Sequence, residues 1–81
     1  MNKDQVMARL TKVFRDVFDD DSIVLSDNTS AKDIEDWDSL EHIRLIAAVE
    51  REFGMRFKMG EVSTMKNVGE MVSIIAARAT K

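Results

Sequence analysis

The segment Asp36-Trp37-Asp38-Ser39-Leu40 contains the residues best suited to chemistry. Asp38 is a good N-cap for a helix, which makes Ser39 the first residue of that helix. Unpaired backbone N–H groups and a partial positive charge at a helix start favour a phosphate group there. Ser39 is therefore a candidate for attachment through a phosphodiester bond. A serine at a helix start is also common without such a role. On spacing alone, the simpler interpretation is that Ser39 is an ordinary helix-start residue.

The chain has few residues suited to other kinds of chemistry. The chain has one histidine, His42, and no cysteine, which excludes a multi-histidine metal site, a thiolate metal site and a cysteine nucleophile. We expect His42 to be an exposed helix residue. The run Asp19-Asp20-Asp21 lacks the glycine and terminal glutamate of an EF-hand loop, so we interpret it as a solvated helix end and expect no metal site. No acid–base pair stands out, so we expect no catalytic residue and no enzyme.

Two segments in the first two thirds of the chain have the apolar spacing of amphipathic helices. One covers residues 4–18. The other, residues 39–53, starts after Asp38, has Glu41 at capping-box spacing, and ends before Gly54, a residue typical of helix C-termini. The wide apolar face predicted for this second helix consists of Leu40, Ile43, Ile46, Ala47, Val49 and Phe53.

The remaining segments are less regular. Residues 19–38 lose the helical period, which predicts a long ordered loop held to the core by Ile23 and Leu25. Residues 60–65 can form at most a short turn of helix. A last helix follows Asn67, another N-cap, with an apolar stripe of Val68, Met71, Val72, Ile75 and Ala79.

The composition indicates one small helical domain. The 81 residues include no proline and three glycines, which disfavours a turn-rich β domain and leaves long stretches free to be helical. We expect a single all-α domain over 1–81, a four-helix bundle with three longer helices and one short one. No apolar run approaches the ~20 residues of a membrane span, and the N-terminus lacks a signal-peptide core. We expect a cytoplasmic monomer that does not bind membranes.

Charge is unevenly distributed along the chain. Residues 16–41 contain ten acidic residues and one basic residue, Lys32, whereas the rest of the chain is mildly basic. An acidic region repels phosphate backbones, so we expect no nucleic-acid binding through it. It favours a basic protein surface as partner.

The motif Asp38-Ser39-Leu40 at a helix start resembles the acyl carrier proteins and related carrier domains. The resemblance covers nearly the whole chain, because the order of helix, long loop, motif serine and further helices also matches. Leu45-Ile46 and the run Glu50-Arg51-Glu52-Phe53 are similar to the family's second helix, and Met55-Arg56-Phe57 is similar to the segment after it.

The resemblance implies a carrier rather than a catalyst. Ser39 would receive 4′-phosphopantetheine from coenzyme A through a separate phosphopantetheinyl transferase. Asp38 would cap the helix and orient the arm, with Leu40 next to it. The arm's thiol would hold an acyl group as a thioester and present it to acyl-loading and acyl-processing enzymes of fatty-acid, polyketide or related biosynthesis.

Two departures from the family pattern bear on partner choice. Asp36 stands where the family commonly has glycine, and Trp37, which follows it, is interpreted as a loop anchor packed on the bundle. Arg44 and Arg51 stand where the housekeeping fatty-acid carrier has acids, so a basic partner groove would be repelled there. Both arginines could instead pair with neighbouring acids such as Glu41 or Glu52.

The predicted partner contacts lie on the second helix: Glu41, Ile43, Arg44, Ala47 and Arg51. We expect Leu40 and Ile43 to lie partly in the core and partly in this surface. Two alternatives remain open at this point. One is an aminoacyl or peptidyl carrier, and the other is a helical interaction module in which Ser39 is unmodified.

Overall fold

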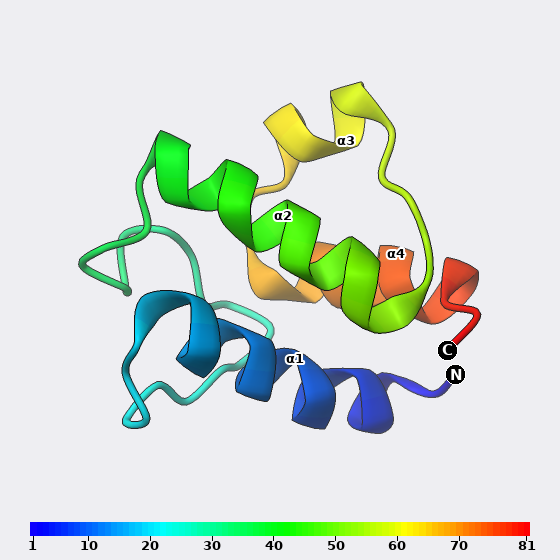
Figure 1. Cartoon of the computed structure of the whole chain (residues 1–81), viewed down its shortest axis with the longest axis horizontal. Coiled ribbons are helices and arrows are strands. Elements are labelled where there is room, and N and C mark those ends of the chain that lie inside the picture. The colour runs from blue at the N-terminus through cyan, green and yellow to red at the C-terminus, as the bar shows by residue number, and fades with distance from the viewer.

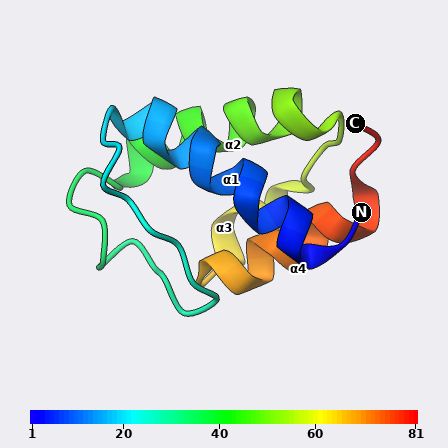
Figure 2. The same ribbon diagram turned by 90° about the horizontal axis from the view of Figure 1, so that it is seen from below.

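The computed structural model describes all residues, 1–81, as four helices without strands. These are α1 (Lys3–Phe18), α2 (Ser39–Phe53), α3 (Met59–Thr64) and α4 (Val68–Arg78). α1 packs against both α2 and α4, and the short α3 lies to one side (Figure 1). The two chain termini lie at the same end of the molecule (Figures 1 and 2). The predicted all-α fold, with three longer helices and one short one, is confirmed.

Reciprocal capping at its N-terminus positions α1. The Asn2 side chain accepts a hydrogen bond from Gln5 N, and the Gln5 side chain accepts one from Asn2 N. The helix ends at Asp19, which adopts a left-handed conformation with φ 50°. Asp19, Asp20 and Asp21 are exposed, as expected of a solvated helix end. The residues that α1 buries are Val6, Leu10, Val13, Phe14 and Phe18.

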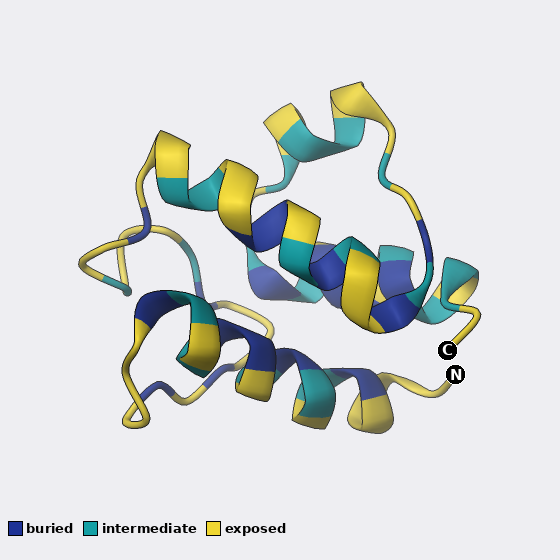
Figure 3. Cartoon of the chain, in the orientation of Figure 1, coloured by how far each residue is buried: buried dark blue, intermediate teal, exposed yellow.

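The bounds predicted for α2 are confirmed, and its buried face matches the predicted one only in part, at Ile46, Val49 and Phe53. Gly54 ends the helix with φ 61°. Leu40 and Ile43 are 67% and 65% exposed, so the expectation that they lie partly in the core is wrong. At 100° per residue, both project away from the row that faces α1. That buried row consists of Leu45, Ile46, Val49 and Phe53 (Figure 3).

The long loop between α1 and α2 is ordered by a few buried side chains. Ile23 and Leu25 are buried, as predicted. The Thr29 hydroxyl accepts a hydrogen bond from Ser26 N at 2.9 Å, and its carbonyl accepts one from Val68 N at 2.8 Å. These contacts connect the loop to the start of α4 and fix the path of the chain toward Ser39.

The last two helices differ in how they are held. α3 contributes no buried residue, whereas α4 buries Val68, Met71, Val72 and Ile75. Asn67 caps α4 as predicted, because its side chain accepts a hydrogen bond from Glu70 N at 3.0 Å. Ala79 lies just beyond the helix and packs at the edge of the core. None of the helices combines the length and the apolar character needed to cross a membrane.

Candidate functional site

Ser39 is the exposed first residue of α2. Asp38 precedes it in an extended conformation, with φ −106°, and its Oδ1 accepts a hydrogen bond from Glu41 N at 2.8 Å. This bond is the predicted N-cap, and it fixes where the helix begins. The Ser39 hydroxyl forms no hydrogen bond within the chain, so it remains free at the surface.

The start of α2 offers backbone donors to an anion. Asp38 Oδ1 engages Glu41 N, and the Asp38 carbonyl accepts a hydrogen bond from His42 N at 2.8 Å. The N–H groups of Ser39 and Leu40 have no partner within the chain. Together with the positive end of the helix dipole, these two donors favour negative charge on the Ser39 side chain. The residues present therefore fit a phosphodiester at this position.

The capping box predicted for Asp38 and Glu41 forms only in half. The Asp38 N–H is already engaged, because it donates to the Asp36 carbonyl at 3.0 Å. The Glu41 carboxylate instead accepts two hydrogen bonds from Arg44 Nη1, at 2.9 and 3.2 Å. The charge-assisted pairing of Glu41 with Arg44 replaces the hydrogen bond that the Glu41 carboxylate was expected to accept from Asp38 N.

His42 is not the exposed helix residue that the sequence predicted. It is half-buried and lies one turn after Ser39. Its Nδ1 accepts a hydrogen bond from Trp37 Nε1 at 3.0 Å, and its Nε2 lies 3.1 Å from the Val62 carbonyl. Trp37 is buried and meets the Phe14 ring edge-on, with centroids 5.2 Å apart, which confirms its interpretation as a loop anchor. His42 thus connects this anchor to α3.

A groove of about 420 Å³ opens next to Ser39. Its apolar lining consists of Ala31, Trp37, Val62, Met65 and Met71. Its polar lining consists of Asp38, Ser39, His42, Ser63, Lys66 and Asn67. The residues from α3 onward were missed in the sequence, because no local pattern places them near a serine more than twenty positions earlier. The pairing of Trp37 with His42 had a local signal, since only five residues separate them.

The predicted partner contacts gather on the outer face of α2. Ile43, Arg44, Ala47 and Arg51 are exposed, and Glu41 lies half-buried at the edge of this face. Arg44 pairs with Glu41, one of the neighbours considered for it. Arg51 forms no ion pair. The structure therefore brings these residues together on one exposed surface, where Arg44 is ion-paired and Arg51 is not.

Known proteins match this chain along most of its length. The sequence profile of the family described as "Phosphopantetheine attachment site" matches residues 8–75. The acyl carrier protein of Acidothermus cellulolyticus is 29% identical over 76 residues, which cover 94% of this chain and 90% of that protein. The acyl carrier protein of Lactobacillus acidophilus is 28% identical over 75 residues, which cover 93% of this chain and 94% of that protein.

A solved structure agrees in fold and in sequence. The solution NMR structure of holo acyl carrier protein from Geobacter metallireducens superposes with a TM-score of 0.85 and 45% identity, covering 90% of this chain and 84% of that one. The segment that matches the attachment-site family, residues 8–75, includes Ser39, the exposed first residue of the capped helix α2. The chain belongs to the acyl carrier protein family, whose cofactor is covalently bound 4′-phosphopantetheine.

Proposed function

We propose that Ser39 is the residue to which 4′-phosphopantetheine is attached. The observation that carries this proposal is its free, exposed hydroxyl at the capped start of α2, beside two unpaired backbone N–H groups. The matched family segment, residues 8–75, includes this position. Ser63 lines the same groove, but its hydroxyl donates to carbonyls within α3, so it lacks these features.

The residues around Ser39 bind and orient the arm. Asp38 fixes the first turn of α2 and thereby the direction in which the Ser39 side chain leaves the helix. The free N–H groups of Ser39 and Leu40 would hold the phosphodiester, and the positive end of the helix dipole would stabilise its charge. When bound, the arm supplies a terminal thiol that holds an acyl group as a thioester.

The chain acts as a carrier, and separate enzymes perform the chemistry. A phosphopantetheinyl transferase loads Ser39 from coenzyme A, and acyl-loading and acyl-processing enzymes then act on the thioester. The outer face of α2, with Glu41, Ile43, Arg44, Ala47 and Arg51, is the proposed contact surface for these partners. The names of the three relatives support an acyl cargo over an aminoacyl one. The monomeric state, the cytoplasmic location and a single domain over 1–81 stay predictions.

Intact-mass measurement after incubation with coenzyme A and a broad-specificity transferase tests the assignment. Wild type and the groove control Ser63→Ala should each gain one phosphopantetheine, and Ser39→Ala should gain none. Circular dichroism of Ser39→Ala should show an unchanged helix content, so that loss of loading is not loss of fold. Loading of Ser39→Ala at any other serine would overturn the assignment.

A further inference from the structure

The exposed face of α2 has opposite charge at its two ends. This face, the α2 stripe, consists of the outward residues Leu40, Ile43, Arg44, Ala47 and Arg51 (Figure 3). Leu40 and Ile43 are large apolar side chains left in solvent close to Ser39. The charges on either side of this apolar pair decide which partner surfaces can approach it.

The end of the α2 stripe near Ser39 is acidic. The loop that leads into α2 carries Asp33, Glu35 and Asp36 as exposed residues, followed by the capping Asp38. None of these four carboxylates forms an ion pair. The loop leads directly into the first turn of α2 (Figure 1), so its carboxylates precede the point where the arm is attached by only a few residues.

The other end of the α2 stripe is basic, because two of its carboxylates are paired with arginines and the remaining cations outnumber the remaining carboxylates. Arg9 binds Glu52 at 2.8 Å, and Arg78 binds Glu61 at 2.5 Å. Glu50 accepts a hydrogen bond from Phe57 N at 2.9 Å. Arginines therefore neutralise two carboxylates at this end, while Glu50 keeps its negative charge at 3.8 Å from Arg56.

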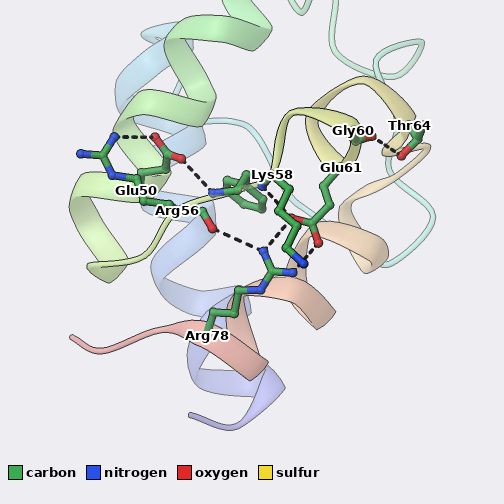
Figure 4. Close-up of polar contacts among 8 residues, drawn as sticks. Glu50, Arg56, Lys58, Gly60, Glu61, Thr64 and Arg78 are labelled. Carbon is green, nitrogen blue, oxygen red and sulfur yellow. Dashed lines mark hydrogen bonds and ion pairs between the residues drawn. The ribbon is translucent and has the colours of Figure 1, made fainter.

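Three cations remain at this end. Arg51 and Lys58 are exposed and form no ion pair, and the side chain of Arg56 is 89% exposed at 3.8 Å from Glu50. Figure 4 shows Glu50, Arg56 and Lys58 together with the Glu61–Arg78 pair. Asp16 of α1 lines the same shallow groove as Arg51 without pairing with it. The three cations Arg51, Arg56 and Lys58 outnumber the two carboxylates Glu50 and Asp16, so the surplus charge at this end is one positive charge.

The two ends are far enough apart to be recognised separately. Ser39 and Arg51 are twelve residues apart on one helix, roughly 18 Å at 1.5 Å per residue. That separation exceeds the screening length of about 8 Å at physiological ionic strength. Arg44, between them, is neutralised by Glu41. A partner thus meets negative charge near the arm, an apolar pair beside it and positive charge at the far end.

We propose that the α2 stripe selects partner enzymes that are basic around the entrance to their active site and acidic about 18 Å away, opposite Arg51. This inference rests on the proposed function, because it takes Ser39 as the attachment point. A partner groove that is basic along its whole length meets like charge at Arg51, so this chain discriminates against it. The two charged ends also set the direction in which α2 lies on a partner, because in the reversed orientation each end would face partner charge of its own sign.

Charge reversal at each end, with a matched control, tests the proposal. The probe is a ketoacyl synthase of fatty-acid synthesis whose docking groove is basic throughout, together with a version whose groove cation farthest from the active-site entrance is changed to glutamate. The carriers are wild type, Arg51→Glu, Asp36→Lys and the control Lys12→Glu. Lys12 is exposed on α1, forms no ion pair and lies outside the α2 stripe.

The two ends should respond with opposite sign. With the unmodified synthase at low salt, Arg51→Glu should raise kcat/KM about two- to fivefold, the range expected for one exposed charge pair. Asp36→Lys should lower it by a similar factor, and Lys12→Glu should leave it unchanged. With the modified synthase, wild type should be preferred over Arg51→Glu. All differences should shrink at high salt.

Two results would overturn the proposal. One is an equal effect of Arg51→Glu and Lys12→Glu on kcat/KM, which would mean that the synthase responds only to the net charge of the carrier. The other is a change of kcat/KM in the same direction in Arg51→Glu and in Asp36→Lys. All carriers are loaded with the same acyl group and checked by intact mass before the assay. A failure to load therefore counts against Ser39, and a failure to discriminate counts against the charge arrangement alone.

Discussion

The indole nitrogen of Trp37 donates a hydrogen bond to Nδ1 of His42 at 3.0 Å, and the two rings stack with centroids 5.9 Å apart. The other ring nitrogen of His42 faces the Val62 carbonyl at 3.1 Å. An imidazole that accepts at Nδ1 carries its proton at Nε2, so it donates to Val62. One neutral side chain thereby joins the loop, the start of α2 and the otherwise poorly buried α3.

Replacing His42 should destabilise the protein and disturb Trp37. In His42→Ala, the indole N–H loses its acceptor in a partly buried position, which costs about 1–2 kcal/mol. Urea denaturation followed by tryptophan fluorescence measures both effects, because Trp37 is the only tryptophan. His42→Gln, which keeps an acceptor and a donor, should recover part of the loss. Equal stability of His42→Ala and wild type would show that the bridge contributes nothing.

The N-cap of α2 should matter more than the residue expected to complete it. Asp38→Ala removes the acceptor for Glu41 N and should cost about 1 kcal/mol, roughly 4–8 °C in melting temperature for a domain of this size. Asp38→Asn keeps an oxygen acceptor and should lose less. Glu41→Ala should cost only a few tenths of a kcal/mol, because Glu41 forms an exposed pair with Arg44 rather than a second cap bond. A larger loss in Glu41→Ala than in Asp38→Ala would contradict the observed geometry.

The ion pair that holds α3 to α4 should make stability depend on acid pH. Hydrogen bonds from Arg78, at 2.6 and 2.5 Å, lower the pKa of Glu61 from 4.5 to about 2. A carboxyl with a lowered pKa in the folded state contributes stability above its unfolded pKa, and this contribution is lost as the pH falls from about 4.5 to about 2. The gap in urea midpoint between wild type and Glu61→Gln should therefore close over this interval.

A control separates this effect from the general loss of an acid. Glu35→Gln removes an exposed carboxyl that forms no ion pair, so its urea midpoint should follow that of wild type through the same pH range. A gap between wild type and Glu61→Gln that stays constant from about pH 5 to about pH 2 would argue against the pairing with Arg78.

Two glycine-to-alanine substitutions should change stability in opposite directions. Gly54 has φ 61°, and an added Cβ would lie 2.6 Å from Thr80 Oγ1, so Gly54→Ala should cost more than about 1 kcal/mol. Gly60 lies within α3, where an added Cβ would meet no atom within 4 Å apart from its chain neighbours and the backbone of its own helix, and Gly60→Ala should gain about 0.5–1 kcal/mol. Thermal melts of both variants check the pair. A loss of stability in both variants would mean that α3 does not tolerate the methyl group of alanine at position 60.

The sequence alone determined the helices and the position of Ser39. Asp38 and Gly54 set both ends of α2 through their own backbone conformations and one short-range hydrogen bond, and such features can be read from neighbouring residues. Asn67 does the same for the start of α4. The motif serine therefore needed no tertiary information to be placed at a helix start.

The tertiary structure decided which residues face inward and what surrounds the serine. The apolar residues of α2 wrap a wide face, and packing against α1 buried Leu45 while leaving Leu40 and Ile43 in solvent. The His42–Val62 contact joins residues 20 positions apart, and the Glu61–Arg78 pair joins residues 17 positions apart. Contacts of this kind depend on how helices pack rather than on any local pattern, because the same sequence spacing is compatible with several rotations of each helix.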